Sequence, residues 1–96
     1  MDVGAAELKA LLEREKIRDC IARLAGGEDR RHAELISASV WPKAIIDHGV
    51  FAGSFEEYLA WVVPGSAAIP VTQHVLGQNV FDVRSDTALV ETRVTA

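Results

Sequence analysis

The sequence predicts an α+β fold in which N-terminal helices pack on one face of a curved antiparallel sheet. Two patterns predict this fold. In the first third of the chain, apolar residues recur at steps of three and four with charged residues between them, which is the spacing of an amphipathic helix. In the last third, apolar and polar residues alternate, which is the period of a half-buried strand. Helices gathered early and long strands late are typical of this class.

The predicted helices begin at the N-terminus. Residues 5–24 are expected to form the first helix, and Gly26 and Gly27 are expected to end it, because glycine is favoured just past a helix end. A shorter second helix is expected over residues 30–39. Asp29 stands where the N-cap of that helix belongs, and aspartate is a preferred N-cap.

The middle of the chain predicts a strand followed by a helix. Residues 44–51 have the pattern of a short strand, which Gly53 is expected to close. Ser54 followed three residues later by Glu57 fits a capping box, in which each residue satisfies a backbone N–H of the other. A third helix is therefore expected to begin there and to run through Trp61.

The last third of the chain predicts two long strands. They are expected over residues 71–83 and 87–95, with a turn at residues 84–86 between them. The alternation is still in full pattern when the sequence reaches Ala96. Such a strand has an unpaired, valine-rich edge unless another strand pairs with it.

Composition and charge bound the function. The 96 residues predict a single domain over residues 1–96, and its net charge of −4 with no basic stripe argues against nucleic-acid binding. No apolar run approaches the ~20 residues of a membrane span, and the N-terminus is too charged for a signal peptide. The single cysteine, Cys20, cannot form an internal disulfide. We therefore expect a reduced, cytoplasmic protein that binds neither nucleic acid nor membrane.

The most informative polar residues lie in the segment of residues 71–79. His74 shares one face of the predicted strand with Thr72 and Leu76. That face suits a pocket lining, although on spacing alone a partly exposed sheet face or a satisfied core histidine is the favoured interpretation. Asp29 gains a chemical role only if the fold brings it to a histidine, whose tautomer a carboxylate fixes and whose charged form it stabilises.

The other candidates have plain structural interpretations. His48 lies at the polar end of the first predicted strand, His32 is interpreted as a surface residue, and Glu28 is compatible with a solvent-facing position. The three histidines lack the close spacing of metal ligands, and no glycine-rich phosphate loop is present, so neither a metal nor a cofactor is expected. The aromatic residues are expected to form the core and a pocket wall: Trp41, Phe51, Phe55, Tyr58, Trp61 and Phe81.

Three segments, together with the order of elements, resemble the SnoaL-like branch of the nuclear transport factor 2-like superfamily: GEDRRHAEL, WPKAIIDHGVFAG and VTQHVLGQ. The resemblance covers the chain from about Lys9 onward and is nearest in pattern to scytalone dehydratase and hexachlorocyclohexane dehydrochlorinase. It implies a cone-shaped α+β barrel around an apolar pocket, with further sheet following the strand that ends at Ala96. We therefore expect either a C-terminally short chain or a pocket wall that another copy supplies.

The same resemblance implies a His–Asp dyad that works without a metal or an organic cofactor. Its catalytic residues correspond to His74 and Asp29. His48 stands in the place of a tyrosine that binds the reacting carbonyl through water, and Glu28 replaces a second tyrosine. Substrate contacts are expected from His48, Glu28, Trp61, Thr72 and Leu76.

The resemblance leaves two functions open. The first is a cofactor-independent lyase or isomerase, similar to a dehydratase, that acts on a small apolar or aromatic, polyketide-like molecule. The second is a non-catalytic module of the same fold that binds a small molecule or holds copies together. Because proteins of this family are commonly dimers or trimers, a homo-oligomer is expected in either case.

Overall fold

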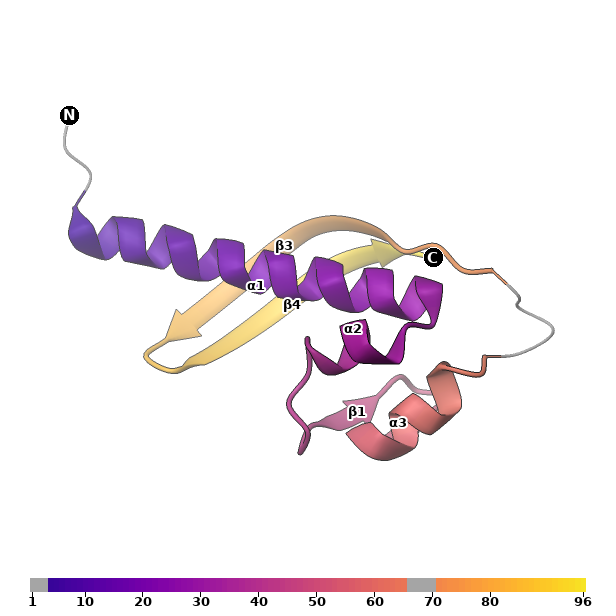
Figure 1. The fold of residues 1–96 in the computed structure, drawn as a ribbon. Helices are drawn as coiled ribbons and strands as arrows, with labels where there is room; N and C mark the ends of the chain where they lie inside the picture. Colours follow the sequence, from indigo (N-terminus) through magenta and orange to yellow (C-terminus); the bar gives the residue numbers. More distant parts are fainter. Residues whose placement is uncertain (1–3, 66–70) are drawn as a thin grey trace.

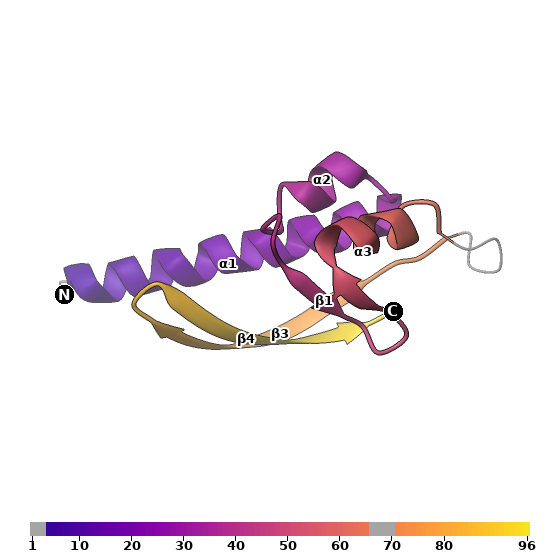
Figure 2. The same ribbon diagram turned by 90° about the horizontal axis from the view of Figure 1, so that it is seen from below.

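The computed structural model describes residues 4–65 and 71–96. The long helix α1 runs along a hairpin of two long strands, and the short elements gather beside its C-terminal end (Figures 1 and 2). In chain order the elements are α1 (Ala5–Arg30), α2 (Ala33–Ser37), β1 (Ile45–Asp47), β2 (Ala52–Ser54), α3 (Phe55–Val62), β3 (Val75–Arg84) and β4 (Thr87–Thr95).

The first helix is longer than its sequence predicts. It continues through Gly26 and Gly27 and ends at Arg30. Arg31 caps it, with a left-handed backbone (φ 53°) and its N–H bonded to carbonyls of the last turn. Gly27 is inside the helix, and its lack of a side chain makes room for the packing of α2. A Cβ at this position would lie only 2.9 Å from Cγ1 of Ile36, so glycine lets α2 approach α1 closely.

This extension corrects the predicted start of the second helix. Asp29 lies in the last turn of α1 and is not an N-cap. His32 takes that position instead, because its Nδ1 accepts a hydrogen bond from the backbone N–H of Leu35 at 3.1 Å. The second helix is consequently shorter than the predicted residues 30–39.

The strand predicted over residues 44–51 is shorter, because β1 covers residues 45–47 and residues 48–51 turn the chain back into β2. Gly53, which was expected to close the predicted strand, lies inside β2. A tight turn separates β1 from β2, and the two pair antiparallel with Ile45 opposite Ser54. Gly49 adopts φ 79° in this turn, and its N–H donates to Oδ1 of Asp47 at 2.8 Å. Since only glycine adopts that conformation readily and aspartate favours such turns, the local sequence accounts for the reversal.

The start of the third helix is as predicted. Ser54 Oγ accepts the N–H of Glu57 at 3.2 Å, and Glu57 Oε1 accepts the N–H of Ser54 at 3.1 Å. Hydrogen bonds to the Glu57 carboxylate, first from the Ser54 backbone N–H and then from the Ser54 side chain, lower the pKa of Glu57. The capping box therefore holds α3 directly after β2.

The long hairpin is also as predicted, with one difference at its start. β3 and β4 pair antiparallel around a turn at Ser85, with an irregularity between Leu76 and Asn79. β3 begins at Val75 and not at residue 71. The backbone N–H of His74 donates to the carboxylate of Asp29 at 2.9 Å, so this residue is bound to α1 and does not join the strand ladder.

The core is small and lies between α2 and α3. Ile36, Phe55 and Tyr58 form its buried centre. Trp41, which was expected in the core or the pocket wall, is 83% exposed in the loop between α2 and β1. The α+β class is confirmed, while the two two-stranded sheets formed by the described residues do not close into a barrel.

Within residues 4–65 and 71–96, no helix has both the length and the apolar character needed to cross a membrane.

Candidate active site

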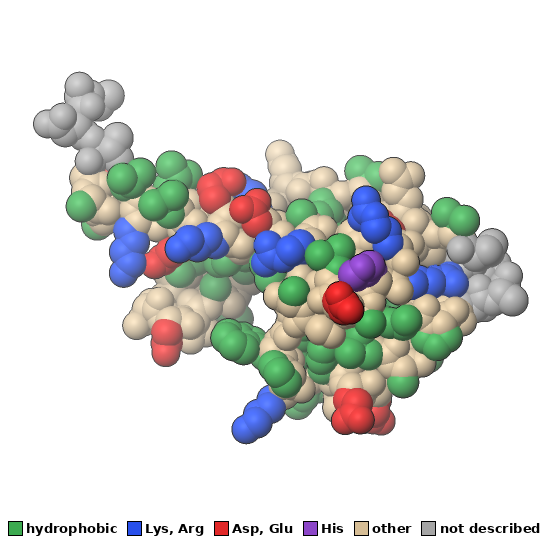
Figure 3. All heavy atoms as spheres, viewed as in Figure 1, with side chains coloured by type: hydrophobic (Ala, Val, Ile, Leu, Met, Phe, Trp, Pro, Cys, Tyr) green, Lys and Arg blue, Asp and Glu red, His purple; other side chains and the backbone are tan. Residues whose placement is uncertain are grey.

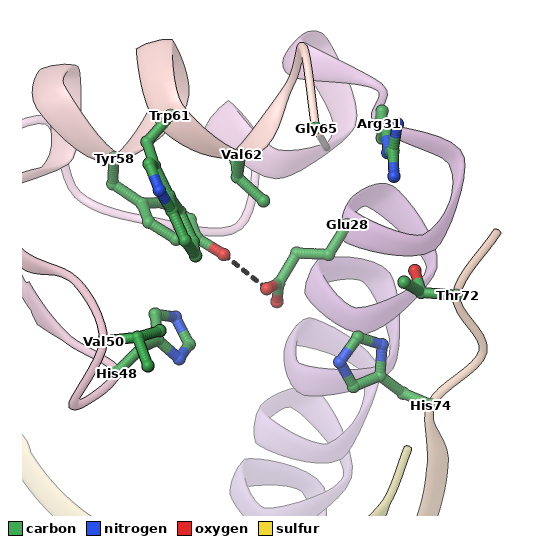
Figure 4. Close-up of a pocket in the computed structure, with 10 residues that line it drawn as sticks. All are labelled: Glu28, Arg31, His48, Val50, Tyr58, Trp61, Val62, Gly65, Thr72 and His74. Atoms are coloured by element: carbon green, nitrogen blue, oxygen red, sulfur yellow. Dashed lines mark hydrogen bonds between the residues drawn. The ribbon is translucent and has the colours of Figure 1, made fainter. Parts of the chain in front are cut away.

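A cavity of about 440 Å³ opens where four segments meet. These segments are the last turn of α1, the turn between β1 and β2, the helix α3, and the extended chain that leads into β3 (Figure 4). The cavity is lined by Glu28, Arg31, His48, Val50, Tyr58, Trp61, Val62, Gly65, Thr72 and His74.

Asp29 and His74 are in direct contact, although they lie 45 residues apart in the chain. Oδ1 of Asp29 lies 2.6 Å from Nδ1 of His74, and Oδ2 accepts the backbone N–H of the same histidine at 2.9 Å. Thr72 adds a third hydrogen bond, from Oγ1 to Oδ1 at 3.1 Å. Three donors thus fix the carboxylate, which in turn fixes the imidazole ring.

The electrostatics of Asp29 favour its charged form. Burial opposes ionisation of this carboxyl, but the hydrogen bonds from the His74 backbone, the His74 ring and Thr72, together with attraction to the His74 charge, outweigh it and lower its pKa. An ionised carboxylate only accepts hydrogen bonds, so Nδ1 of His74 is the donor. In the neutral form of the ring, the other nitrogen, Nε2, then has a lone pair, which is the form a general base requires.

The two residues occupy different places relative to the cavity. The side chains of His74 and Asp29 are 26% and 19% exposed, and His74 lines the cavity whereas Asp29 does not. His74 is therefore the residue that can touch a bound molecule. Asp29 lies behind it and acts as a positioning residue.

Tyr58 and Glu28 form a second polar pair in the cavity. The Tyr58 hydroxyl donates a hydrogen bond to Oε2 of Glu28 (Figure 4). Burial, followed by the hydrogen bond and the negative charge of Glu28, raises the pKa of Tyr58 far above its ordinary value. The phenol consequently keeps its proton throughout the physiological range.

His48 lies over the ring of Tyr58. The two ring centroids are 5.1 Å apart with an interplanar angle of 25°, which is a stacked arrangement. The β1–β2 turn holds His48 in place, because its N–H donates to the carbonyl of Phe51 at 2.7 Å. In Figure 4 the ring lies on the opposite side of the cavity from His74.

Most of the site residues expected from the sequence meet at this cavity. His74, His48, Glu28, Trp61 and Thr72 line it. Leu76 does not, because β3 carries it beyond the cavity, where it lies opposite Val94.

Half of the lining residues were not predicted as site residues: Arg31, Val50, Tyr58, Val62 and Gly65. Tyr58 was expected in the core and pocket wall, and it is 2% exposed with its hydroxyl at the cavity. Arg31 donates to the carbonyl of Pro64 at 3.4 Å, and its guanidinium fills the space beside Gly65. Position on the inner side of α3 was the only sequence signal for Tyr58, and none pointed to Arg31.

No group of three or more His, Cys, Asp or Glu side chains is placed to hold a metal ion in the described part of the chain. The polar groups of the cavity are instead arranged in pairs. One pair, Asp29 with His74, is suited to taking up a proton, and the other, Glu28 with Tyr58, is suited to accepting a hydrogen bond.

Comparison with known families gives one match. The model of the SnoaL-like domain matches residues 9–96. Comparisons with curated proteins and with solved structures give no significant match. The narrower resemblance to scytalone dehydratase and hexachlorocyclohexane dehydrochlorinase therefore has no support from these comparisons. Because the match spans nearly the whole chain, the protein belongs to the SnoaL-like family of the nuclear transport factor 2-like superfamily.

Proposed function

We propose that this protein is a cofactor-independent enzyme of the lyase or isomerase type, which removes a proton from a carbon next to an activating carbonyl. The contact between His74 Nδ1 and Asp29 Oδ1, at 2.6 Å on the wall of a cavity, is the observation that carries this proposal. The family supports it in a general way, because SnoaL-like proteins include isomerases and dehydratases.

His74 is the base in the proposed reaction. Its Nε2 takes the proton, and the electron pair of the broken C–H bond passes toward the carbonyl oxygen of the substrate. Asp29 holds the ring and balances the positive charge that the imidazolium acquires. The proton then returns to a different carbon in an isomerisation, or leaves with a departing hydroxyl as water in an elimination. General-base catalysis of this kind contributes ~10²–10⁴-fold to the rate.

The cavity suits a small, largely apolar or aromatic substrate. Its volume of about 440 Å³ lies within the range of small-molecule sites. Trp61, Val50 and Val62 supply apolar surface. His48 faces this space from the side opposite His74 and is the proposed hydrogen-bond donor to the substrate carbonyl.

Proton exchange with solvent tests the proposal without knowledge of the natural substrate. Enolisable ketones are incubated with the protein in D₂O, and loss of the α-proton signal is followed by ¹H NMR. The parent is expected to accelerate exchange, and His74→Ala is expected to lose ~10²–10⁴-fold of that acceleration. His32→Asn is the matched control, because it removes an exposed imidazole outside the cavity and keeps an N-cap residue on α2. Exchange that is as fast in His74→Ala as in the parent would sink the proposed mechanism.

A second candidate function is a non-catalytic module that assembles with further copies of this chain. The accessible surface of the chain is 7493 Å². A compact monomer of this length exposes only ~5,400 Å². The difference exceeds the ~800 Å² that each partner contributes to a standard interface. Assembly without any exchange activity would favour this candidate over the enzyme.

The surface proposed for this assembly is the apolar side of the N-terminal part of α1. Leu8, Leu11 and Leu12 are 45–52% exposed there, and Figure 3 shows hydrophobic side chains gathered at this end of the helix. Their spacing of three and four residues places them on one face. The proposal also includes a cytoplasmic location, which the single cysteine supports because one thiol forms no internal disulfide.

A further inference from the structure

A carboxylate stands inside the cavity and has no part in the proton transfer proposed above. Glu28 precedes Asp29 in the last turn of α1, and its side chain reaches into the cavity. Figure 4 shows its carboxylate between the Tyr58 hydroxyl and the His74 ring. A charged group so close to the proposed base affects which molecules the cavity accepts.

Tyr58 fixes the orientation of this carboxylate. The phenol ring is packed among His48, Phe51 and Trp61, with ring centroids 5.1, 5.7 and 6.1 Å away, so its hydroxyl has one position. Its single proton is used in the hydrogen bond to Oε2 of Glu28. Tyr58 is therefore occupied as a donor, and Glu28 is held by a rigid, buried group.

The other oxygen of Glu28 remains an acceptor. An ionised carboxylate offers about four lone-pair positions across its two oxygens. Among the residues that the structure describes, Oε2 accepts from Tyr58 and Oε1 accepts from no donor. Because Glu28 lines the cavity, a bound molecule can supply the donor.

The surrounding charge favours a donor over an anion at this position. The C-terminal end of α1 carries a partial negative charge from the helix dipole, and Asp29, behind the cavity wall, adds a full one. Arg31, the cation of the cavity wall, donates to the carbonyl of Pro64 and lies against Gly65. A carboxylate on the ligand would meet the Glu28 carboxylate directly, with the charge of Asp29 behind His74, whereas a hydroxyl or an ammonium would be attracted to Glu28.

We propose that Glu28, held by Tyr58, binds a hydrogen-bond donor of the substrate, either a hydroxyl group or a protonated amine. The substrate class is then a small carbonyl compound that carries such a group away from the carbon that His74 deprotonates. This inference rests on the proposed function, because it names the molecules that the same cavity takes.

Binding of a matched set of ketones tests the inference. The probes are para-hydroxyacetophenone, para-(aminomethyl)acetophenone and para-methoxyacetophenone, of which only the last lacks a donor at the para position. A hydrogen bond to a charged group is expected to make the hydroxyl probe bind about 10-fold more tightly than the methoxy probe in titration calorimetry. The hydroxyl and aminomethyl arms show whether the site prefers a neutral or a cationic donor.

Variants assign the preference to Glu28. Glu28→Gln is expected to reduce it to within about 2-fold, because Tyr58 still needs an acceptor and the amide then presents N–H₂ to the ligand. Tyr58→Phe is expected to weaken it by releasing the carboxylate. Glu34→Gln, an exposed substitution on α2, is the control and should change nothing. Circular dichroism verifies that each variant is folded.

The outcomes separate this inference from the proposed function. Binding of both the hydroxyl and the aminomethyl probe to the parent no more tightly than the methoxy probe, no binding of any probe at millimolar concentration, or an unchanged preference in folded Glu28→Gln would each overturn it. A Glu28-dependent preference without α-proton exchange would keep this binding role and reject the proposed catalysis. Exchange without the preference would do the opposite.

Discussion

At the scale of single residues, the orientation of the His74 ring depends on how the two oxygens of Asp29 share their hydrogen-bond donors. One oxygen accepts from the His74 backbone, and the other accepts from the His74 ring and from Thr72. Periodicity and capping rules had assigned Asp29 to the N-cap of α2, because those rules consider only near neighbours. The pairing with His74 was expected only from the family resemblance, since no local pattern reports a contact across 45 residues.

The lowered pKa of Asp29 predicts how stability depends on pH. Above the unfolded-state pKa of ~3.9, Asp29 is ionised in both states and its hydrogen bonds stabilise the fold in full. As the pH falls through the lower folded-state pKa, that contribution is lost. The urea midpoint of the parent should therefore exceed that of Asp29→Asn at pH 7, and the difference should shrink below pH ~4.

A matched carboxylate checks the pH prediction. Asp19 is exposed on the same helix, so Asp19→Asn should have little effect at either pH. A difference between the parent and Asp29→Asn that stays constant or grows on acidification would contradict the hydrogen-bonded, ionised state of Asp29.

At the scale of elements, the sequence predicts correctly those features that depend on contacts between near neighbours in the chain, and it fails where the contacts join distant residues. The Ser54–Glu57 capping box and the alternation of β4 are local, and both were predicted correctly. The predicted C-terminal end of α1 at Gly26 and Gly27 was wrong. Glycine is required at position 27 by the close contact between α1 and α2, which local sequence rules do not consider. Tyr58 was expected in the core and pocket wall, but its hydrogen bond to Glu28 was not predicted, since Glu28 lies 30 residues earlier.

The two glycines of α1 predict opposite effects of the same substitution. At position 26, an alanine Cβ would meet only the flexible guanidinium end of Arg30, at 2.9 Å. Gly26→Ala should therefore stabilise the protein by ~0.5–1 kcal/mol, through lower backbone entropy in the unfolded chain. At position 27, the Cβ would lie 2.9 Å from the buried Ile36 side chain. Gly27→Ala should cost ~1–3 kcal/mol through overpacking.

Urea unfolding of the two alanine variants compares them directly, and each serves as the control for the other. Shifts of the midpoint in the same direction would contradict the packing of α1 on α2 through Gly27.

At the scale of the whole molecule, the chain is extended for its length. Its radius of gyration is 15.4 Å and its extents are 55 × 26 × 23 Å. A compact domain of 96 residues has a radius of gyration of only ~12.5 Å. The exposed leucines of α1 contribute to this extended shape. The helix is amphipathic in sequence, but its first half has little to pack against.

Self-association is the prediction that belongs to this scale. Sedimentation velocity over a range of concentrations should show assembly of the parent into a species heavier than a monomer. Leu12→Glu should shift the distribution toward the monomer, because it places a charge on the apolar face of α1. Lys43→Ala, an exposed change in the loop before β1, should not. A parent that stays monomeric at all concentrations would reject association through this face.

The orientation of the His74 ring by Asp29 is the central claim, and the ring nitrogens report it directly. In ¹⁵N NMR spectra of the neutral ring, we expect the parent to have its proton on Nδ1 and a free lone pair on Nε2. In Asp29→Asn, the backbone N–H of His74 requires the amide oxygen at the position of Oδ2, so the amide N–H₂ takes the position of Oδ1 and faces Nδ1. The Thr72 hydroxyl can then accept from the amide, and the ring proton should move to Nε2. A parent ring protonated on Nε2, or a tautomer that is unchanged in Asp29→Asn, would contradict the account.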